Sequence, residues 1–301
     1  MYDIIIIGAG PAGLTAAIYA RRASKKVLVI EKNTYGGQII NTLDIENYPA
    51  YEHISGFDFA TNIYNQAKSL GAEIIFENVV DIIDNEKTKE VITNKTKYTS
   101  KAVIIATGSE NRKLGLENED SLVGKGISYC ATCDGAFYKD KIVAVVGGGN
   151  TALEDALYLS DIANKVYLIH RRDSFRAEES TINKLKEKSN VEFIYNSNVT
   201  KLNSNEKLES IEVTNKNSSV EKIDVDGLFI AIGRIPENEN FAKLINLDSS
   251  GYIISDDSCI TNVKGIYASG DNRVKDVRQL VTATSDGAIA ATKAINYINN
   301  I

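Results

Sequence analysis

Two cysteines and an adjacent acid are the residues of this chain best suited to chemistry. Cys130 and Cys133 stand three positions apart, and Asp134 follows the second. Residues three apart on a helical or tight turn lie roughly 5–6 Å from each other, a separation that suits a disulfide. The pair can therefore open and close without the fold being rebuilt. The Asp134 carboxylate can supply or hold the proton that thiolate chemistry needs, and a second, compatible role for it is to cap a helix N-terminus.

The composition is that of an ordinary soluble globular protein. The 301 residues are 43% hydrophobic and 25% charged, which suggests about two domains, and the net charge of −6 comes from scattered charges without a nucleic-acid-binding cluster. Its apolar runs fall short of the ~20 residues of a membrane helix, and its start does not resemble a signal peptide. With only three cysteines, we expect a cytoplasmic protein in which one close pair indicates transient redox chemistry or a metal site.

A glycine-rich turn near the start of the chain is typical of dinucleotide binding. An apolar strand, Ile4 to Ile7, runs into Gly8-Ala9-Gly10-Pro11-Ala12-Gly13, and a helix-like pattern and a second apolar strand follow. The first glycine permits a tight turn, the second lets the backbone approach a pyrophosphate, and the third lets helix and strand pack closely. The helix N-terminus would face the phosphates. Glu31 ends the second strand, where its carboxylate can accept hydrogen bonds from ribose hydroxyls.

The same pattern recurs later in the chain. A shift of 139 positions places Gly8 on Gly147, Gly10 on Gly149 and Gly13 on Ala152 without a gap. Repetition of a whole strand, turn, helix and strand predicts a second dinucleotide fold. In this second copy the strand is followed by a histidine and arginines in place of Glu31, namely His170, Arg171, Arg172 and Arg176. Guanidinium groups at that strand end suit a ribose 2′-phosphate, so we expect an unphosphorylated dinucleotide in the first fold and NADP in the second.

The rest of the chain completes this arrangement. Apolar strands end in small turns at Ala106-Thr107-Gly108 and at Ile232-Gly233, and a third runs into Gly270-Asp271. A helix of small and apolar residues then extends from Arg278 to about Ile298. The first fold would be incomplete without this last segment. We therefore predict an α/β fold with two Rossmann-like dinucleotide-binding domains (three-layer ββα), the second inserted in the first.

Three interpretations of the Cys pair compete. A structural zinc site usually needs four Cys or His ligands, and beyond the pair the chain offers only Cys259, His53 and His170, without ligand spacing. A static disulfide is unusual in the cytosol and leaves two nucleotide folds unexplained. A redox-active dithiol fits both folds, because a flavin can accept a hydride from NADPH and pass electrons to a disulfide sulfur. Cys259 is expected to be a buried apolar thiol.

Together these motifs resemble those of the low-molecular-weight bacterial thioredoxin reductases, class II flavin-dependent pyridine nucleotide disulfide oxidoreductases. The resemblance rests on Cys130 to Gly135, Gly147 to Ala152 and His170 to Ala177. It extends in one register over nearly the whole chain, through Gly8 to Gly13, Gly36-Gly37-Gln38, Glu46-Asn47, Gly270-Asp271 and Arg278-Gln279. Related ferredoxin-dependent reductases lack the second glycine loop and the arginines, so their presence here argues for NADPH as donor.

The resemblance implies FAD in a domain formed by residues 1–112 and 246–301, and NADPH in a domain formed by residues 113–245 that carries the Cys pair. It implies that Cys133 contacts the flavin, that Cys130 exchanges with thioredoxin, and that Asp134 is the acid or base. The residues expected along FAD are Gly8, Gly10, Pro11, Ala12, Gly13, Glu31, Gly36, Gly37, Gln38, Asn47, Ala106, Thr107, Gly108, Gly270, Asp271, Arg278, Gln279 and Leu280. Those expected along NADPH are Gly147, Gly149, Asn150, Thr151, Ala152, His170, Arg171, Arg172, Arg176, Ile232 and Gly233.

The same resemblance implies a homodimer with thioredoxin as a transient protein substrate. The ligand spacing, the charge pattern and the short apolar runs predict no metal, nucleic-acid or membrane partner. Because nicotinamide and disulfide both need access to the flavin, we expect the inserted domain to rotate about linkers near 113–117 and 242–247. Two alternatives stay open. One is a flavin reductase for another small disulfide partner, and the other is an NAD(P)H oxidase or electron-transfer flavoprotein whose Cys pair is incidental. A non-enzymatic nucleotide-binding sensor is a more remote third.

Overall fold

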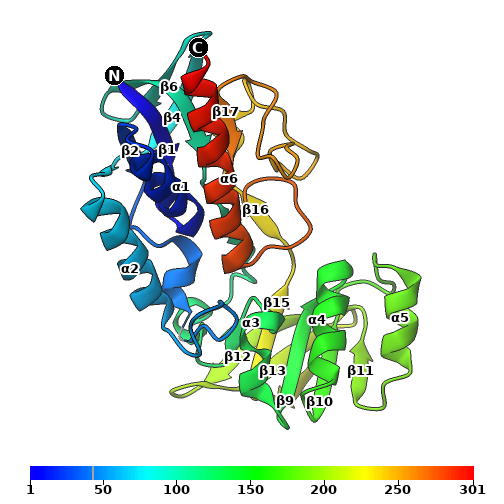
Figure 1. Ribbon diagram of the computed structural model, residues 1–301. Coiled ribbons are helices and arrows are strands. Elements are labelled where there is room, and N and C mark those ends of the chain that lie inside the picture. The colour runs from blue at the N-terminus through cyan, green and yellow to red at the C-terminus, as the bar shows by residue number, and fades with distance from the viewer. Residues whose placement is uncertain (43) are drawn as a thin grey trace. The chain divides into compact units, whose positions relative to one another are not determined.

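The computed structural model describes residues 1–42 and 44–301, which form two compact units (Figure 1). The first unit comprises Met1–Glu110 and Ile235–Ile301, and the second comprises Asn111–Arg234. The second unit is therefore inserted in the first. The chain passes from one to the other in β7 (Ser109–Asn111) and β16 (Arg234–Pro236), two short strands that pair with each other.

The return to the first unit comes earlier than the sequence suggested. We expected the inserted part to run to residue 245, but the second unit ends at Arg234. The reason is packing, because Phe241 and Ile245 are 3% and 1% exposed within the hydrophobic core of the first unit. The expected linkers, near 113–117 and 242–247, consequently lie inside the two units rather than between them.

One seven-stranded sheet organises the first unit. Its strand order is β3-β2-β1-β6-β5-β4, and β17 pairs with the C-terminal half of β6. The strands β3, β2, β1, β6 and β17 are parallel, whereas β4, β5 and the first half of β6 form an antiparallel meander. The strand bounds are β1 Tyr2–Ile7, β2 Val27–Glu31, β3 Glu73–Phe76, β4 Val79–Asn85, β5 Thr88–Thr93, β6 Lys97–Ile105 and β17 Ile266–Ala268.

Alternation along β1 divides the first unit into layers. Ile4 and Ile6 contribute to the core that contains the helices, whereas Ile5 and Ile7 contribute to the core that contains the meander, as expected when successive strand residues point to opposite faces. All four are buried to 4% exposure or less. Figure 1 shows α1 and α6 lying side by side, with α1 packed on β1 and α6 packed on β6 and β17. The helices of this unit are α1 Pro11–Arg22, α2 Gly56–Ser69 and α6 Leu280–Asn299.

The second unit repeats this plan on a smaller scale. A parallel sheet has the order β11-β10-β9-β15-β8, and a separate antiparallel sheet has the order β12-β13-β14. Its strands are β8 Ile127–Ser128, β9 Ile142–Gly147, β10 Lys165–Ile169, β11 Val191–Ile194, β12 Ser197–Ser204, β13 Leu208–Asn215, β14 Val220–Asp224 and β15 Gly227–Ala231. Its helices are α3 Ala131–Asp134, α4 Asn150–Ser160 and α5 Glu179–Lys186. Short 3₁₀ helices in the chain are η1 Gly37–Asn41, η2 Asp120–Leu122, η3 Gly135–Tyr138 and η4 Glu239–Phe241.

The internal repeat read from the sequence is confirmed strand by strand. In the first unit β1 pairs with β2 in the register Ile7 to Ile30, and in the second β9 pairs with β10 in the register Val146 to Ile169. These pairs are related by the same shift that superposes the glycine loops. The prediction of an α/β fold built from two copies of a β-α-β unit is therefore correct. Among residues 1–42 and 44–301, no helix has both the length and the apolar character needed to cross a membrane.

Candidate active site and nucleotide-binding loops

The Cys pair occupies one short helical turn of the second unit. Cys130 precedes α3 and Cys133 lies within it, and the two are joined by a disulfide with a Cα–Cα distance of 5.3 Å. The backbone N–H of Asp134 donates to the carbonyl of Cys130 at 3.1 Å, which closes the turn. The separation expected from sequence spacing is thus observed. The Thr132 hydroxyl oxygen lies 3.5 Å from the Cys130 sulfur, and the fold leaves the turn accessible enough that Cys130 is only partly buried.

Asp134 sits at the end of this turn in a sheltered position. Its side chain makes no capping hydrogen bond to η3, so the capping role considered from the sequence is wrong. Instead the Ser128 hydroxyl donates to Asp134 Oδ2 at 2.6 Å. Burial raises the pKa of Asp134 above its ordinary value, although the Ser128 hydrogen bond acts in the opposite direction. A raised pKa suits a carboxyl group that takes up and releases a proton.

The first glycine loop has the close packing that its sequence requires. Gly8 adopts a φ of +108°, and a Cβ there would lie 2.3 Å from the Ala106 carbonyl oxygen. A Cβ on Gly13 would lie 2.0 Å from the carbonyl oxygen of Gly8, so only glycine lets α1 pack on the turn. Gly10, by contrast, has no atom within 4.0 Å of its notional Cβ except the Cα of Gly37. Gly10 is therefore dispensable for the fold itself and leaves open space beside the N-terminus of α1.

Glu31 turns back toward this loop. Its carboxylate accepts hydrogen bonds from the backbone N–H groups of Ala9 at 2.8 Å and Asn33 at 3.0 Å. It also lines a pocket of about 480 Å³ in the first unit, together with Gly8, Lys32 and Thr107. An acid beside a glycine loop and a pocket of this size fit the ribose end of a dinucleotide. Pro11 begins α1 and Ala12 is buried within it.

Several of the other residues expected along FAD are brought together in the first unit. Gly37 approaches the first loop, because a Cβ on it would lie 3.3 Å from the Cα of Gly10, and Gly36 N–H donates to the Ala9 carbonyl at 2.8 Å. Asn47 Nδ2 donates to Gln279 Oε1 at 3.3 Å. Gln279 is the N-cap of α6, whose first residue is Leu280, and shares a capping box with Thr282. Gln38 lies in η1. Arg278 stacks on the ring of Tyr252, at 4.3 Å from its centroid.

The loop after β17 is anchored by residues that sequence reasoning missed. Asp286, 3% exposed on α6, accepts hydrogen bonds from the guanidinium of Arg273 at 2.7 and 2.8 Å, from Lys275 Nζ at 2.9 Å and from Gly270 N–H at 3.0 Å. Burial alone would raise the pKa of Asp286, but these cationic donors hold it below the ordinary value. These bonds hold the loop that carries Asp271 against α6. A charged residue amid the small residues of a helix was the one sequence signal for this network.

The Ala106-Thr107-Gly108 turn follows β6 at the same end of the sheet. Asn272 Nδ2 donates to the Thr107 hydroxyl oxygen at 3.1 Å, which ties this turn to the loop after β17. Gly108 has a φ of +72° and nothing within 4 Å of its notional Cβ. Both turns lie at the carboxyl ends of parallel strands, where open α/β sheets bind ligands.

The second glycine loop repeats the first with one substitution. A Cβ on Gly147 would lie 2.4 Å from the Ala231 carbonyl oxygen and 2.5 Å from the Ala152 Cβ. Because Gly147 has no Cβ, the methyl group of Ala152 fits at the position that Gly13 has in the first loop. Gly149 has open space around it. Asn150 and Thr151 begin α4. The turn ending in Ile232 and Gly233 follows β15, and Gly233 has a φ of +101°.

The residues expected at the ribose 2′-phosphate differ in burial, since His170 is buried whereas the arginines are exposed or half-buried. His170 is 8% exposed, with its ring beside Gly148 and its Nε2 3.1 Å from the Ser174 carbonyl oxygen. Burial lowers its pKa. Arg176 donates its backbone N–H to the Gly148 carbonyl at 2.7 Å, which holds the arginine segment against the glycine loop. Arg171 is exposed, and Arg172 is half-buried.

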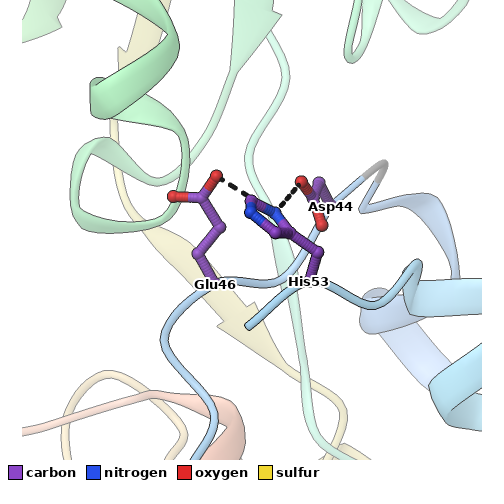
Figure 2. A group of neighbouring side chains, drawn as sticks. All are labelled: Asp44, Glu46 and His53. Atoms are coloured by element: carbon purple, nitrogen blue, oxygen red, sulfur yellow. Dashed lines mark hydrogen bonds and ion pairs between the residues drawn. The ribbon is translucent and has the colours of Figure 1, made fainter. Parts of the chain in front are cut away.

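A group of ionisable side chains also gathers in the segment that carries Asn47. Figure 2 shows His53 between Asp44 and Glu46, and His53 Nδ1 lies 2.8 Å and 3.5 Å from their carboxylate oxygens. An isolated β-bridge between Ile45 and Ile54 brings the three side chains together. The Asp44 carboxylate raises the pKa of His53. His53 is a surface residue, since its side chain is 66% exposed.

Comparisons with known proteins identify the group to which this arrangement belongs. The pyridine nucleotide-disulphide oxidoreductase family matches residues 2–287. A thioredoxin reductase of Bacillus subtilis is 42% identical over all of this chain and 96% of its own length. The chain therefore belongs to the pyridine nucleotide-disulphide oxidoreductase family. Within it, the similarity to thioredoxin reductases covers the full length, including 45% identity to that of Mycoplasma genitalium over 97% of this chain and 94% of the relative.

Solved structures of this family agree with the fold. The crystal structure of thioredoxin reductase from Streptococcus pyogenes matches with a TM-score of 0.96 at 42% identity, over 100% of this chain and 99% of that one. The Lactococcus lactis thioredoxin reductase in its FR conformation matches with a TM-score of 0.69 at 39% identity, over all of both chains. The family resemblance inferred from the sequence motifs, and with it the reductase class of the enzyme, is therefore confirmed.

Proposed function

We propose that this protein is an NADPH-dependent thioredoxin reductase in which the Cys130–Cys133 pair delivers the electrons. The observation that carries the proposal is a reducible disulfide on an accessible turn of the same unit that holds the second, arginine-bearing nucleotide fold. The full-length similarity to thioredoxin reductases supports thioredoxin as the disulfide substrate.

The first unit is proposed to bind FAD. Gly8, Gly10 and Gly13 form a turn that a side chain would fill, and the N-terminus of α1 points its free N–H groups at the same place, which suits a pyrophosphate. Glu31 is suited to the ribose hydroxyls. The other residues proposed along FAD are Pro11, Ala12, Gly36, Gly37, Gln38, Asn47, Ala106, Thr107, Gly108, Gly270, Asp271, Arg278, Gln279 and Leu280. When bound, a flavin supplies the conversion of a two-electron hydride donor into electrons for a disulfide.

The second unit is proposed to bind NADPH. Arg171, Arg172 and Arg176 can pair with a 2′-phosphate through charge-assisted hydrogen bonds, and His170 supports the segment that carries them. The other residues proposed along NADPH are Gly147, Gly149, Asn150, Thr151, Ala152, Ile232 and Gly233.

The chemistry at the Cys pair follows from the turn. Cys133 is proposed as the sulfur that faces the flavin and Cys130 as the sulfur that exchanges with thioredoxin. Exchange needs a thiolate to attack and a proton for the thiolate that leaves, and Asp134 is the group that holds that proton. Its sheltered position keeps the acid form available closer to neutral pH than in an exposed aspartate. We further propose a cytoplasmic homodimer, following the resemblance to the family.

One variant separates this function from an NAD(P)H oxidase or electron-transfer flavoprotein. Cys133→Ser should abolish NADPH-driven reduction of thioredoxin while NADPH still bleaches the flavin absorbance. An oxidase with an incidental Cys pair would keep its full turnover in the variant. Wild-type activity with a glutaredoxin-like protein and none with thioredoxin would instead indicate another disulfide partner.

A further inference from the structure

Ser128 contacts the Cys turn at three points. It is the last residue of β8 and is 3% exposed. Its Oγ lies 2.6 Å from Asp134 Oδ2, 3.0 Å from the backbone N of Cys130 and 3.3 Å from the Cys130 carbonyl oxygen. A buried hydroxyl therefore joins the carboxyl group of the turn to the backbone of its first cysteine.

These three contacts cannot all be made at once. A serine hydroxyl has one hydrogen to donate and two lone pairs that accept. The Cys130 N–H occupies one lone pair of the Ser128 oxygen. The single hydroxyl hydrogen of Ser128 can then be donated either to Asp134 or to the Cys130 carbonyl, but not to both. The 2.6 Å distance to Asp134 is that of an O–H donor to a charged oxygen, whereas 3.3 Å is long for an O–H donor. The hydrogen therefore points at Asp134 while that group is ionised.

Protonation of Asp134 would reverse this choice. A neutral carboxylic acid can donate its own hydrogen to the remaining lone pair of Ser128. The Ser128 hydrogen is then free to turn to the Cys130 carbonyl, and the bond from the Cys130 N–H stays in place. Both ionisation states of Asp134 are thus satisfied without movement of the backbone.

We propose that Ser128 is a positioning residue of the dithiol site, whose hydroxyl holds the Asp134 carboxyl in place and reorients as Asp134 gains and loses its proton. The inference rests on the proposed function only in giving Asp134 a role in thiol chemistry. Ser128 lies outside the motif that runs from Cys130 to Gly135.

The surroundings leave Ser128 as the main polar influence on Asp134. Tyr138 from η3 lies near Asp134, Lys141 Nζ lies over the Tyr138 ring at 5.4 Å from its centroid, and Tyr158 from α4 lies against Gly135. Asp226 lies beyond Tyr138, and burial together with Asp134 and Asp226 raises the pKa of Tyr138 to about 12. Tyr138 therefore stays neutral across the working pH range. Removal of the Ser128 hydroxyl leaves the charges of Asp226 and Lys141 unchanged, so it should act on Asp134 through the lost hydrogen bond.

The test measures the ionisation of Asp134 directly in the full-length oxidised protein. The infrared band of its protonated carboxyl group is followed against pH, with Asp134→Asn as the blank. Ser128→Ala should raise the pKa of Asp134 by about one unit, since it removes a donor to the ionised form. Ser160→Ala is the matched control, because Ser160 is also buried in the second unit but donates to the Leu157 carbonyl at 2.6 Å.

A second readout follows the chemistry. The pH dependence of thioredoxin reduction should move to higher pH by the same amount in Ser128→Ala, and Ser128→Thr should restore the wild-type profile. An unchanged pKa of Asp134 in Ser128→Ala, or an equal shift in Ser160→Ala, would overturn the proposal. A shifted pKa in a protein without thioredoxin reductase activity would uphold the positioning role and refute the proposed function. If Ser128→Ala did not fold, Ser128→Thr and Ser128→Val would replace it, because their side chains have the same shape with and without the hydroxyl. The pKa of Asp134 should then be higher in Ser128→Val than in Ser128→Thr, and equal values would overturn the proposal.

Discussion

At the scale of single residues, the proton that Asp134 is proposed to hold gives the clearest prediction. Replacement by asparagine keeps the shape and the Ser128 contact but removes the ability to take up a proton. We expect Asp134→Asn to slow thioredoxin reduction by about 10²-fold, the lower range for loss of a general acid or base. NADPH-driven flavin reduction should stay at the wild-type rate. Rapid-mixing absorbance measurements separate the two steps, and an equal loss in both would argue against the assigned role.

The two histidines of the chain offer a second prediction at this scale. Asp44 raises the pKa of exposed His53, whereas burial lowers the pKa of His170. Proton NMR of the two imidazole rings should show titrations on opposite sides of the ordinary value near 6.5. Asp44→Asn should lower the His53 value and leave His170 unchanged. Since the folded pKa of His53 is raised, its stabilising contact is complete at low pH and is lost as the pH rises through that pKa.

Some of these residues were predictable and others were not. Cys130, Cys133 and Asp134 stand together in the sequence, so their proximity needs no tertiary information. Ser128 and Asp286 act through side chains whose partners are fixed only by the fold: β8 brings Ser128 over the Cys turn, and α6 brings Asp286 under the loop of Gly270 and Arg273. Nothing in the local sequence marks Ser128 as distinct from an ordinary surface residue. Asp286 stands out only as a charged residue amid the small residues of its helix, which does not reveal its partners.

At the scale of elements, the first glycine loop contains one glycine that the packing requires, Gly13, and one that is proposed to leave room for FAD, Gly10. Gly13→Ala would force a Cβ to 2.0 Å from the Gly8 carbonyl oxygen, so we expect a loss of roughly 1–3 kcal/mol in the free energy of unfolding. Gly10→Ala has room, since Gly10 has a φ of −76° and no close neighbour, and should keep the wild-type stability. It should nonetheless retain less FAD, because its methyl group would stand where the pyrophosphate is proposed to lie. Thermal unfolding of the flavin-free proteins and flavin absorbance measure the two effects. Normal FAD content in Gly10→Ala would refute the placement.

The arginine segment after β10 gives a further prediction at this scale. Loss of a hydrogen bond to a charged group costs about 1.5–3 kcal/mol, which corresponds to roughly 10–100-fold in affinity. Arg176→Ala should therefore weaken NADPH binding by about that factor and leave NADH binding nearly unchanged. Arg22→Ala, in the last turn of α1 in the other unit, is the matched control. Equal losses for both nucleotides would show that Arg176 does not recognise the 2′-phosphate.

The elements themselves were well predicted from local pattern. The strand, glycine turn, helix and strand of each copy carry their own signals, and the register pairs Ile7 with Ile30 and Val146 with Ile169 as the repeat requires. The end of the inserted part was not predictable in this way. Residues 235–245 have no change in composition that marks them as part of the first unit, and only the burial of Phe241 and Ile245 assigns them there.

At the scale of the whole molecule, the Cys pair and the proposed FAD site belong to different units that are joined by β7 and β16. The nicotinamide and the disulfide must each reach the flavin, so we expect the second unit to take two orientations in turn.

A covalent cross-link between the units tests this expectation. The locked protein should perform one half-reaction, either flavin reduction by NADPH or electron transfer to the disulfide, and lose steady-state turnover. A cross-link within one unit serves as the control and should leave both half-reactions intact. Turnover at the normal rate in the locked protein would contradict the rotation.

A steady-state assay of the purified protein with thioredoxin shows whether electrons pass from NADPH to thioredoxin. We predict that one disulfide of thioredoxin is reduced for each NADPH oxidised, and that kcat/KM is at least about 10-fold lower with NADH, as loss of the 2′-phosphate contacts implies. Equal or better use of NADH, or NADPH oxidation without reduction of the thioredoxin disulfide, would contradict it.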